Sequence, residues 1–287
     1  MPRARVPTMP TLKAIHSEEF PLVYNDQLRI LDENKSEAQW RHLLFPPWHQ
    51  VSREVGYGLF EGGRIVGFAG YVRSEQRTVK GPRQFINLSS WVVDDAHRNA
   101  AMALMMPAIK EKDAILTNLT PLPSVHAIFS KLGFKVLETH TRTHFYVPSV
   151  GFGNTVRFDD EILPAALPAG QEPVHRSHRA LASTALVEGR HGTCYVVYTV
   201  VRRRGLPGVR LHHVAPRDGL AWALRPLQAA VLLRHGALLV EYDRRLAVGA
   251  PGPFVDRPIT PNRLYRGTDI APEDVTNAYS ELVILNI

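Results

Sequence analysis

The sequence contains only one cysteine, Cys194, among its 287 residues. A single cysteine excludes an intrachain disulfide and favours a reducing compartment, the cytoplasm. Also missing is any apolar run close to the roughly 20 residues that a membrane-spanning helix needs. The two arginines of MPRARVPTMP are not followed by the apolar stretch of a secretory signal. We therefore expect no membrane partner and interpret residues 1–10 as a flexible tail.

Acidic residues are fewer than basic ones, 27 against 34, which gives a net charge of +7. Such a balance suits either a nucleic acid or a polyanionic small molecule. The arginines are scattered, with the densest run at 202–204, and they lack the interleaved aromatic residues of single-strand binders. The sequence therefore favours a small polyanion over nucleic acid.

The composition, 45% hydrophobic and 21% charged, is that of a globular protein. Prolines and glycines concentrate between residues 147 and 173, with LPAALPAG at the centre, and this indicates an irregular connection. We predict a first domain over 11–150, a linker over 151–173 and a second domain over 174–287.

The first predicted domain alternates between strand-like and helix-like segments. Two β-rich runs flank the pair Gly62-Gly63, which is typical of a hairpin. The expected order is a helix over 36–44, strands over 55–60, 64–73 and 85–93, a helix over 100–112 that Pro107 ends or kinks, a strand over 114–118, a helix over 124–132 and a strand pair over 134–147. This order predicts an α/β (α+β) fold with a mixed, mostly antiparallel sheet flanked by helices.

The second predicted domain also alternates between helix-like and strand-like segments, and it is expected to be smaller than the first. Its predicted elements are a helix over 177–188, strands over 193–201 and 209–214, a helix over 219–235, and strands over 237–242 and 281–287. Segments 91–104 and 213–224 occupy equivalent places, each between a strand and a long helix. This faint internal repeat suggests two related α/β halves.

The segment with the clearest chemistry runs from Trp91 to Ala103. A strand ends at Val93, a short polar turn follows, and Arg98 opens the predicted helix. Such a turn offers unpaired backbone N–H groups and the positive end of a helix dipole, which bind anions such as pyrophosphate. Arg98 adds a positively charged guanidinium group that can donate two parallel hydrogen bonds. The small residues after it let a ligand approach the backbone.

Three segments in the same order resemble GCN5-related N-acetyltransferases (GNAT). RNAAMA at 98–103 is similar to the family's Arg/Gln-x-x-Gly-x-Gly/Ala turn, except that alanine replaces glycine at 101. AIFSKLGF at 127–134 is similar to the family's later helix, and LFEGGRIVGFAGYV at 59–72 to its central strands. The resemblance covers about 50–145, and the second half suggests a tandem arrangement with a degenerate second GNAT-like domain.

The resemblance implies that a primary amine of a small molecule, such as an amino sugar or amino acid, attacks an acyl-CoA directly, with acetyl-CoA as the default co-substrate. The residues implied in coenzyme A binding are Trp91, Val92, Val93, Arg98, Asn99, Ala100, Ala101, Met102 and Ala103. The family supplies an oxyanion donor from a backbone N–H of the splayed strand, here around 91–93. Candidate bases are Asp94 and Asp95, with His97 beside them and Glu54 as an outlying candidate.

Each of these residues also has a structural interpretation. Asp94 and Asp95 precede a helix start and are the residue type that caps helices, while His97 would be an exposed turn residue and Arg98 a surface arginine. On a regular strand Ser89 and Trp91 share one face. Phe129 stands where many members of the family have the tyrosine that protonates the leaving thiolate. Phe129 and Ala101 both favour the alternative of a catalytically silent fold that binds acyl-CoA or a partner protein as a sensor or scaffold.

Histidine is abundant, at 13 residues, and invites a metal hypothesis. His175-x-x-His178 and His191-x-x-Cys194 resemble the spacing of a zinc site. A His3Cys set is unusual, however, and Cys194 lies in the apolar run CYVVYTVV, which favours a buried inert thiol. We therefore expect no metal. The second half has only Arg217 roughly in the place of Arg98, so we expect no cofactor of its own there.

Overall fold

In the computed structural model, residues 9–50, 52–148 and 153–287 are described, and they form two compact units. One unit consists of residues up to 76 together with 83–117, and the other of 77–82 together with 118–287. This division differs from the predicted boundaries at 150 and 174, because the strand after residue 118 pairs with strands near the C-terminus. The predicted tail lies mostly outside the described residues. None of the described helices is long and apolar enough to cross a membrane.

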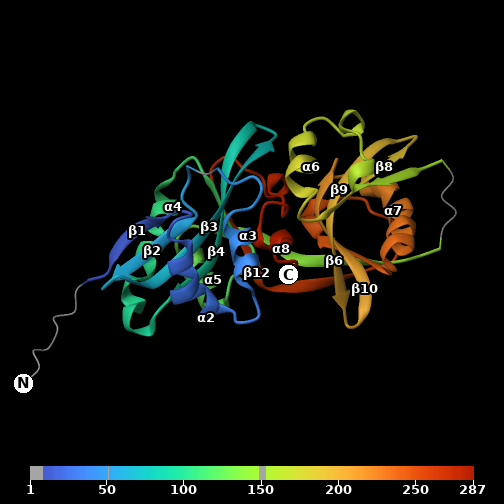
Figure 1. Cartoon of the computed structure of the whole chain (residues 1–287). Coiled ribbons are helices and arrows are strands. Elements are labelled where there is room, and N and C mark those ends of the chain that lie inside the picture. Colours follow the sequence, from blue (N-terminus) through green and yellow to red (C-terminus); the bar gives the residue numbers. More distant parts are fainter. Residues whose placement is uncertain (1–8, 51, 149–152) are drawn as a thin grey trace, which may run out of the picture. The chain divides into compact units, whose positions relative to one another are not determined.

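The first unit is built on a sheet in the order β1-β2-β3-β4-β5 (Figure 1). The strands span Thr11–Ile15 (β1), Gly56–Glu61 (β2), Arg64–Thr78 (β3), Gly81–Val93 (β4) and Ile115–Asn118 (β5). The predicted hairpin at Gly62-Gly63 is confirmed, with both glycines at positive φ. β4 and β5 run parallel, and the other pairs whose register is known are antiparallel. The sheet is therefore mixed, as predicted.

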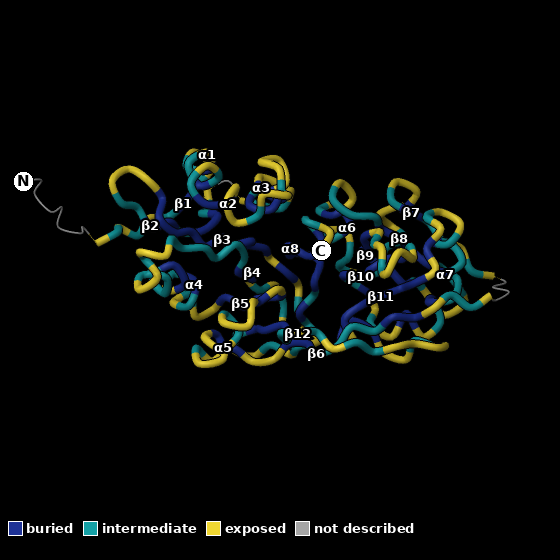
Figure 2. The backbone as a smooth tube through the Cα atoms, turned by 90° about the horizontal axis from the view of Figure 1, so that it is seen from below, coloured by how far each residue is buried: buried dark blue, intermediate teal, exposed yellow. Residues whose placement is uncertain are grey.

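Helices cover both faces of this sheet (Figure 2). They span Phe20–Val23 (α1), Tyr24–Leu28 (η1, a π-helical turn), Arg29–Leu31 (α2), Glu37–Leu44 (α3), Asp95–Leu104 (η2, a 3-10 helix) and Met106–Lys110 (α4). Leu44 of α3 lies toward Gly70 of β3. The next residue along β3, Tyr71, donates its hydroxyl to the carbonyl of Leu104, so α3 and η2 lie on opposite faces. A capping box of Ser36 and Gln39 begins α3.

The second unit has a sheet in the order β12-β6-β11-β10-β9-β8-β7. The strands span Lys135–Phe145 (β6), Thr155–Phe158 (β7), Ser183–Gly189 (β8), Gly192–Arg203 (β9), Leu206–Ala215 (β10), Leu239–Asp243 (β11) and Phe254–Arg266 (β12). The helices span Pro123–Lys131 (α5), Asp159–Glu161 (η3), Pro164–Ala166 (η4), Glu172–His178 (α6), Leu220–His235 (α7), Arg244–Leu246 (η5), Pro272–Asp274 (η6) and Glu281–Ile284 (α8). This unit is the larger of the two, contrary to the prediction.

β9 divides the core of the second unit between its two faces. Cys194, Val196 and Tyr198 pack with the apolar face of α7. The intervening Tyr195 and Val197 pack on the other side with Val174 of α6. Gly236 ends α7 in a left-handed conformation, which glycine adopts without strain.

The two units repeat one motif. In each, three strands that follow one another in the chain are neighbours in the sheet, and helical segments lead from the third to a strand that runs parallel to it, β4 with β5 and β10 with β11. The predicted internal repeat is therefore confirmed at the level of topology.

Four predicted elements differ from the structure. Residues 177–188 are not one helix but the end of α6 and the start of β8, and 281–287 contains the short helix α8 and no strand. The predicted strand pair over 134–147 is the single strand β6, and the helix over 100–112 is replaced by η2 and α4.

Candidate functional site

β4 and β5 separate partway along their length in the first unit. Only Phe85, Ile86 and Asn87 pair with β5, opposite Ile115–Thr117. In the last of these pairs, Thr117 donates its hydroxyl to the side-chain oxygen of Asn87 at 3.0 Å. β4 then continues through Leu88–Val93 while β5 ends at residue 118. This part of β4 has an edge that β5 leaves open.

The open part of β4 contains an irregularity at Ser90. Ser90 has φ +54°, in the left-handed region, and its Oγ lies 3.2 Å from the Oγ of Ser89. On a regular strand neighbouring side chains point to opposite faces, which was the basis for expecting Ser89 with Trp91 on one face and Ser90 on the other. The left-handed residue instead brings the two hydroxyls together. The expected alternation is therefore wrong at this point.

The segment after β4 is not the α-helix start that the sequence predicts. Residues 95–104 form the 3-10 helix η2, and α-helical geometry begins only at Met106. Pro107 gives the physical reason, because proline fits the first turn of an α-helix but not its interior. The full-length helix dipole expected behind Arg98 is therefore replaced by a 3-10 turn and a helix of five residues.

The predicted coenzyme A residues divide into two accessible groups. Trp91, Val92 and Val93 are half-buried on β4. On η2, Arg98 and Asn99 are exposed, and the following small residues and Met102 are half-buried. The side chain of Arg98 is 75% exposed and forms a 2.7 Å ion pair with Asp95. The structure thus leaves these residues within reach of a ligand but supplies Arg98 with an internal partner.

Two of the candidate bases lie at the junction of β4 and η2. Asp94 forms no capping hydrogen bond to η2, so the capping interpretation is wrong for its side chain. Its carboxylate accepts a 3.1 Å hydrogen bond from Gln27, and Gln27 also donates to the carbonyl of Ile65. Asp95 is exposed and paired with Arg98. Asp94 is therefore held against η1, whereas Asp95 faces solvent.

Glu54 belongs to a separate network of ion pairs. Its carboxylate accepts a hydrogen bond from Arg73, whose side chain is 7% exposed. Arg73 also donates to both oxygens of Glu111, at 3.0 and 2.7 Å. Burial, together with the charge of Glu54, raises the pKa of Tyr57 nearby. The structure therefore engages Glu54 in holding a buried guanidinium.

His97 is not the exposed turn residue that was expected. Its side chain is 17% exposed, and Nε2 lies 3.2 Å from a carboxylate oxygen of Glu61. Glu61 ends β2, and nothing in its sequence context marked it as a partner. This pair connects η2 to the β2–β3 hairpin.

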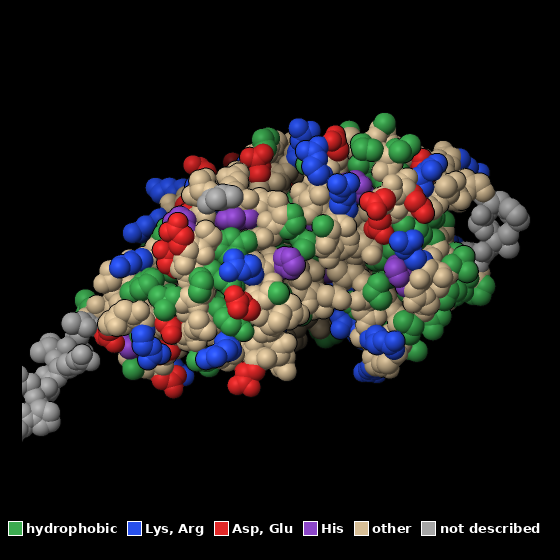
Figure 3. Space-filling view, viewed as in Figure 1, with side chains coloured by type: hydrophobic (Ala, Val, Ile, Leu, Met, Phe, Trp, Pro, Cys, Tyr) green, Lys and Arg blue, Asp and Glu red, His purple; other side chains and the backbone are tan. Residues whose placement is uncertain are grey.

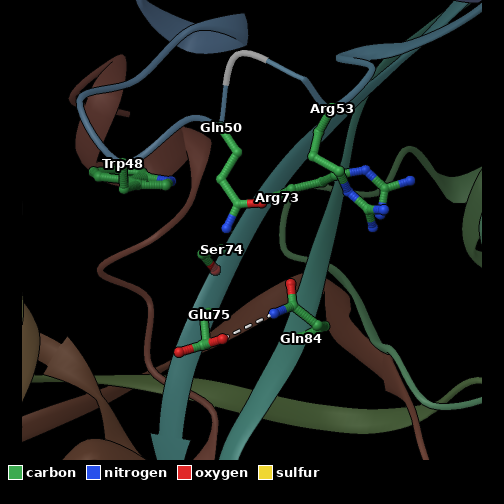
Figure 4. Close-up of a pocket in the computed structure, with 7 residues that line it drawn as sticks. All are labelled: Trp48, Gln50, Arg53, Arg73, Ser74, Glu75 and Gln84. Carbon is green, nitrogen blue, oxygen red and sulfur yellow. Dashed lines mark hydrogen bonds between the residues drawn. The ribbon is translucent and has the colours of Figure 1, made fainter.

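A polar pocket lies along the β3–β4 hairpin of the first unit. It is a small recess, partly open to solvent, and is lined by Trp48, Gln50, Arg53, Ser74, Glu75 and Gln84. The buried Arg73 contributes to its wall. Glu75 accepts a 3.1 Å hydrogen bond from Gln84 across the two strands (Figure 4). No sequence pattern indicated this pocket, because its residues come from a loop and two strands.

Arg217 of the second unit follows β10 in the way that Arg98 follows β4, and its guanidinium is bonded within its own unit. Arg217, expected as the remnant of Arg98, donates two hydrogen bonds of 3.0 and 2.7 Å to the carbonyl of Arg245. The N–H of Val248 returns a bond to the carbonyl of Arg217. A side chain at Gly219 would collide with Cys194. Arg217 and Gly219 are therefore engaged in contacts within the second unit.

The four residues of the metal hypothesis have other surroundings. His175 lies 3.4 Å from hydroxyls of Thr184 and Tyr195, and His191 contacts Arg190 and Trp222. Burial raises the pKa of the Cys194 thiol to about 12. Within the described residues, no group of three or more histidine, cysteine or acidic side chains could hold a metal ion.

Basic side chains are interspersed with acidic ones on the face of the molecule shown in Figure 3. Among the lysines and arginines whose bonds are known, many are paired, as with Arg142 and Asp256 at 2.8 Å. The view agrees with the scattered arginines of the sequence.

Comparison with solved structures identifies the fold. The chain is similar to a GCN5-related N-acetyltransferase from Anabaena variabilis, with a TM-score of 0.60 and 11% identity over 90% of this chain and 72% of that one. It is similar to a GCN5-related N-acetyltransferase from Kribbella flavida, with a TM-score of 0.59 and 16% identity over 91% and 71%. It is also similar to Eis1 from Mycobacterium abscessus, with a TM-score of 0.52 and 14% identity over 90% and 74%. No protein-family model matches the chain, and no curated protein matches it in sequence. The chain therefore has the GNAT fold.

Proposed function

We propose that this chain is an acyl-CoA-dependent N-acyltransferase that transfers an acyl group, acetyl by default, directly to a primary amine of a small molecule. The observation that carries the proposal is the open edge of β4, where the strand leaves β5 after Asn87 and turns irregular at Ser90. Two parallel strands that part leave backbone N–H and C=O groups of β4 without a partner on β5, and we place the thioester beside these groups.

The residues of η2 suit the diphosphate end of coenzyme A. Arg98 is exposed enough to reach a phosphate once it leaves Asp95, and guanidinium groups bind phosphate with two parallel hydrogen bonds. Ala100, Ala101 and Ala103 are half-buried and small, so the ligand can lie close to the backbone. A backbone N–H of 91–93 would then donate to the oxyanion that develops on the thioester carbonyl.

We assign the amine acceptor to the pocket along β3 and β4. Glu75 offers a carboxylate and Trp48 an aromatic ring, and both attract an ammonium group. Gln84 of this pocket and Ser90 are six residues apart on β4, which corresponds to about 20 Å. An acceptor held at Glu75 that reacts near Ser90 is therefore elongated, which favours an amino sugar of more than one ring over a free amino acid.

A second candidate function is a silent fold that binds acyl-CoA or a partner protein as a sensor or scaffold. Two observations favour it. The Arg98–Asp95 pair must open before Arg98 binds a phosphate. Phe129 is 1% exposed and stacks on Phe134 at 4.7 Å in the second unit, so it packs as a core residue and offers no proton. The single buried thiol fits a reducing compartment, and we place either function in the cytoplasm.

Titration calorimetry and a thiol-release assay test these alternatives. The enzyme binds acetyl-CoA and releases thiol with at least one member of a panel of amino sugars, amino acids and polyamines. Binding without thiol release across the panel supports the silent fold, and no binding at 1 mM rejects both acyl-CoA functions. In the active enzyme, Glu75→Gln raises KM for the amine about tenfold while KM for acetyl-CoA stays unchanged. An unchanged amine KM rejects the assigned pocket.

A further inference from the structure

Ser89 and Ser90 form a hydroxyl pair that neither the fold nor the open edge requires. Among the described residues, the other non-glycine residues with positive φ lie in turns, bends and a short 3-10 segment, whereas Ser90 lies within a strand. Left-handed backbone is unfavourable for an L-residue, and glycine adopts it freely. Such strain within regular structure is characteristic of functional sites. Its geometric result here is the 3.2 Å contact between the two Oγ atoms.

The position of the pair matches the open edge of β4. Both serines follow the last residue paired with β5, Asn87, and both are half-buried, so they remain accessible. The carbonyl oxygen of Ser89 lies toward Gly70 of β3, at 3.2 Å from where a Cβ would stand. The backbone of Ser89 therefore lies against β3. Ser90 follows it on the part of β4 that no longer pairs with β5.

The proposed transfer needs a proton to be moved, and the expected groups are already engaged. Glu54 accepts from Arg73, and Asp94 accepts from Gln27. Asp95 is paired with Arg98, and Phe129 has no hydroxyl. A serine hydroxyl both donates and accepts a hydrogen bond. Two serines in contact can therefore pass a proton along without either being ionised in the resting state.

We infer, on the basis of the proposed function, that Ser89 and Ser90 form a proton relay for aminolysis of the thioester. The amine nitrogen forms the C–N bond and the C–S bond breaks. The proton of the attacking amine passes to Oγ of Ser89 as the Ser89 hydroxyl proton moves to Oγ of Ser90. The Ser90 hydroxyl proton passes to the departing sulfur. Both serines end as hydroxyls, the products are an amide and a thiol, and no further reactant is consumed.

Single substitutions of the pair test the relay in the full chain. Ser90→Gly removes the hydroxyl and accepts left-handed backbone, so it folds even if Ser90→Ala does not. We expect Ser90→Gly and Ser89→Ala each to lower kcat about 100-fold, the usual effect of losing a proton-transfer group. The Kd of acetyl-CoA, measured by calorimetry, changes less than twofold. Ser90→Thr keeps a hydroxyl and recovers most of the lost kcat. Ser130→Ala, on the exposed face of α5, is the matched control and leaves kcat unchanged.

Three results separate the possible failures. If the wild type turns over an amine and the Ser89 and Ser90 variants keep kcat within threefold, the relay is wrong and the proposed function stands. If Ser90→Gly weakens acetyl-CoA binding as much as it lowers kcat, Ser90 shapes the binding site and the relay is also wrong. If the wild type binds acetyl-CoA without releasing thiol to any amine, the transferase and the relay are overturned together.

Discussion

Asp95 and Arg98 form an ion pair of 2.7 Å across one turn of η2, with both side chains largely in solvent. An exposed pair of this kind contributes little to stability. Its consequence lies in binding, because the guanidinium that the sequence assigns to a phosphate already has a carboxylate beside it. A diphosphate that binds Arg98, as we propose, has to compete with Asp95.

This competition predicts opposite effects of two substitutions on coenzyme A binding. Arg98→Ala removes a charged hydrogen-bond donor and weakens acetyl-CoA binding by about 1–3 kcal/mol. Asp95→Asn frees Arg98 and strengthens binding about twofold, the scale of an exposed ion pair. Calorimetry at low salt measures both effects. Arg190→Ala, an exposed arginine of the second unit, is the control. Equal affinity of Arg98→Ala and the wild type means that the diphosphate binds elsewhere.

Substitution of Glu54 distinguishes a catalytic role of this carboxylate from a structural one. Arg73 is almost fully buried between Glu54 and Glu111. Glu54→Gln therefore lowers the free energy of unfolding by about 2 kcal/mol, the value of a hydrogen bond to a charged group, and changes kcat by less than about threefold. Urea denaturation and steady-state kinetics measure the two quantities. Glu18→Gln, an exposed carboxylate, should change neither. If Glu54→Gln instead slows turnover by about two orders of magnitude, the usual effect of losing a general base, Glu54 is the base after all.

The sequence predicted the elements that local signals define. Ser36 with Gln39 and the pair Pro46-Pro47 bracket α3, and Gly236 ends α7, because caps and stops act through the backbone nearest to them. The β2–β3 hairpin follows for the same reason, since its two glycines supply the positive φ values of the turn.

The errors occur where long-range packing overrides local preference. The sequence STALVEG of β8 contains helix-forming residues, yet it lies between β7 and β9 in the sheet, with Leu186 and Val187 buried. β12 was not predicted at all, because Pro258 and Pro261 interrupt its pattern. For the 281–287 segment, Ser280 accepts a hydrogen bond from the N–H of Leu282 and starts α8 in place of the expected strand.

The candidate site also has features that the sequence predicted and features that it did not. The order of strand, turn and small residues at 91–103 was predicted from the sequence, because the predicted coenzyme A residues lie in one continuous segment. Its 3-10 geometry and the Asp95–Arg98 pair depend on how Pro107 delays the helix and on side-chain rotamers. The Ser89–Ser90 contact was not predicted, because nothing in the letters Ser-Ser marks a left-handed residue within a strand. The pocket at Glu75 brings together residues more than 30 positions apart, as with Trp48 and Gln84.

We predict from Asp243 that the second unit loses stability below about pH 4. Its carboxylate is buried and accepts from Arg245, Arg263 and Asn277. The guanidinium groups outweigh the cost of burial and lower its pKa to about 2. Because the folded pKa lies below the unfolded value of about 4, this stabilisation is present above pH 4 and is lost as the pH falls toward 2.

The loss amounts to about 2.5 kcal/mol, because one pKa unit corresponds to about 1.4 kcal/mol and the pKa is lowered by slightly less than two units. At pH 7, Asp243→Asn lowers the free energy of unfolding by about 3–5 kcal/mol, since it leaves two arginines buried without their carboxylate. Asp160→Asn, at an exposed aspartate, serves as the control in urea denaturation. A cost below about 1 kcal/mol for Asp243→Asn would show that the network relaxes or takes in solvent.

We predict from His212 a second loss of stability in acid, which begins at a higher pH than the one from Asp243. It is fully buried in β10, where Nε2 lies 2.9 Å from the hydroxyl of Thr199, and burial lowers its pKa to about 3. In the unfolded chain the pKa of a histidine is about 6.5. Between these values the unfolded state binds a proton that the folded state does not, so stability decreases as the pH falls from about 6.5 toward 3. The slope is about 1.4 kcal/mol per pH unit for this one group.

His212→Gln removes this titration while keeping an amide donor for Thr199. We expect the variant to be somewhat less stable at pH 7.5 and to lose less stability than the wild type between pH 6.5 and 4.5. Urea denaturation at several pH values measures the difference in slope, which should approach one proton. His42→Gln, at an exposed histidine of α3, leaves the slope unchanged. Parallel pH profiles of His212→Gln and the wild type would mean that His212 takes up its proton in the folded state, through water that reaches the interior of β10.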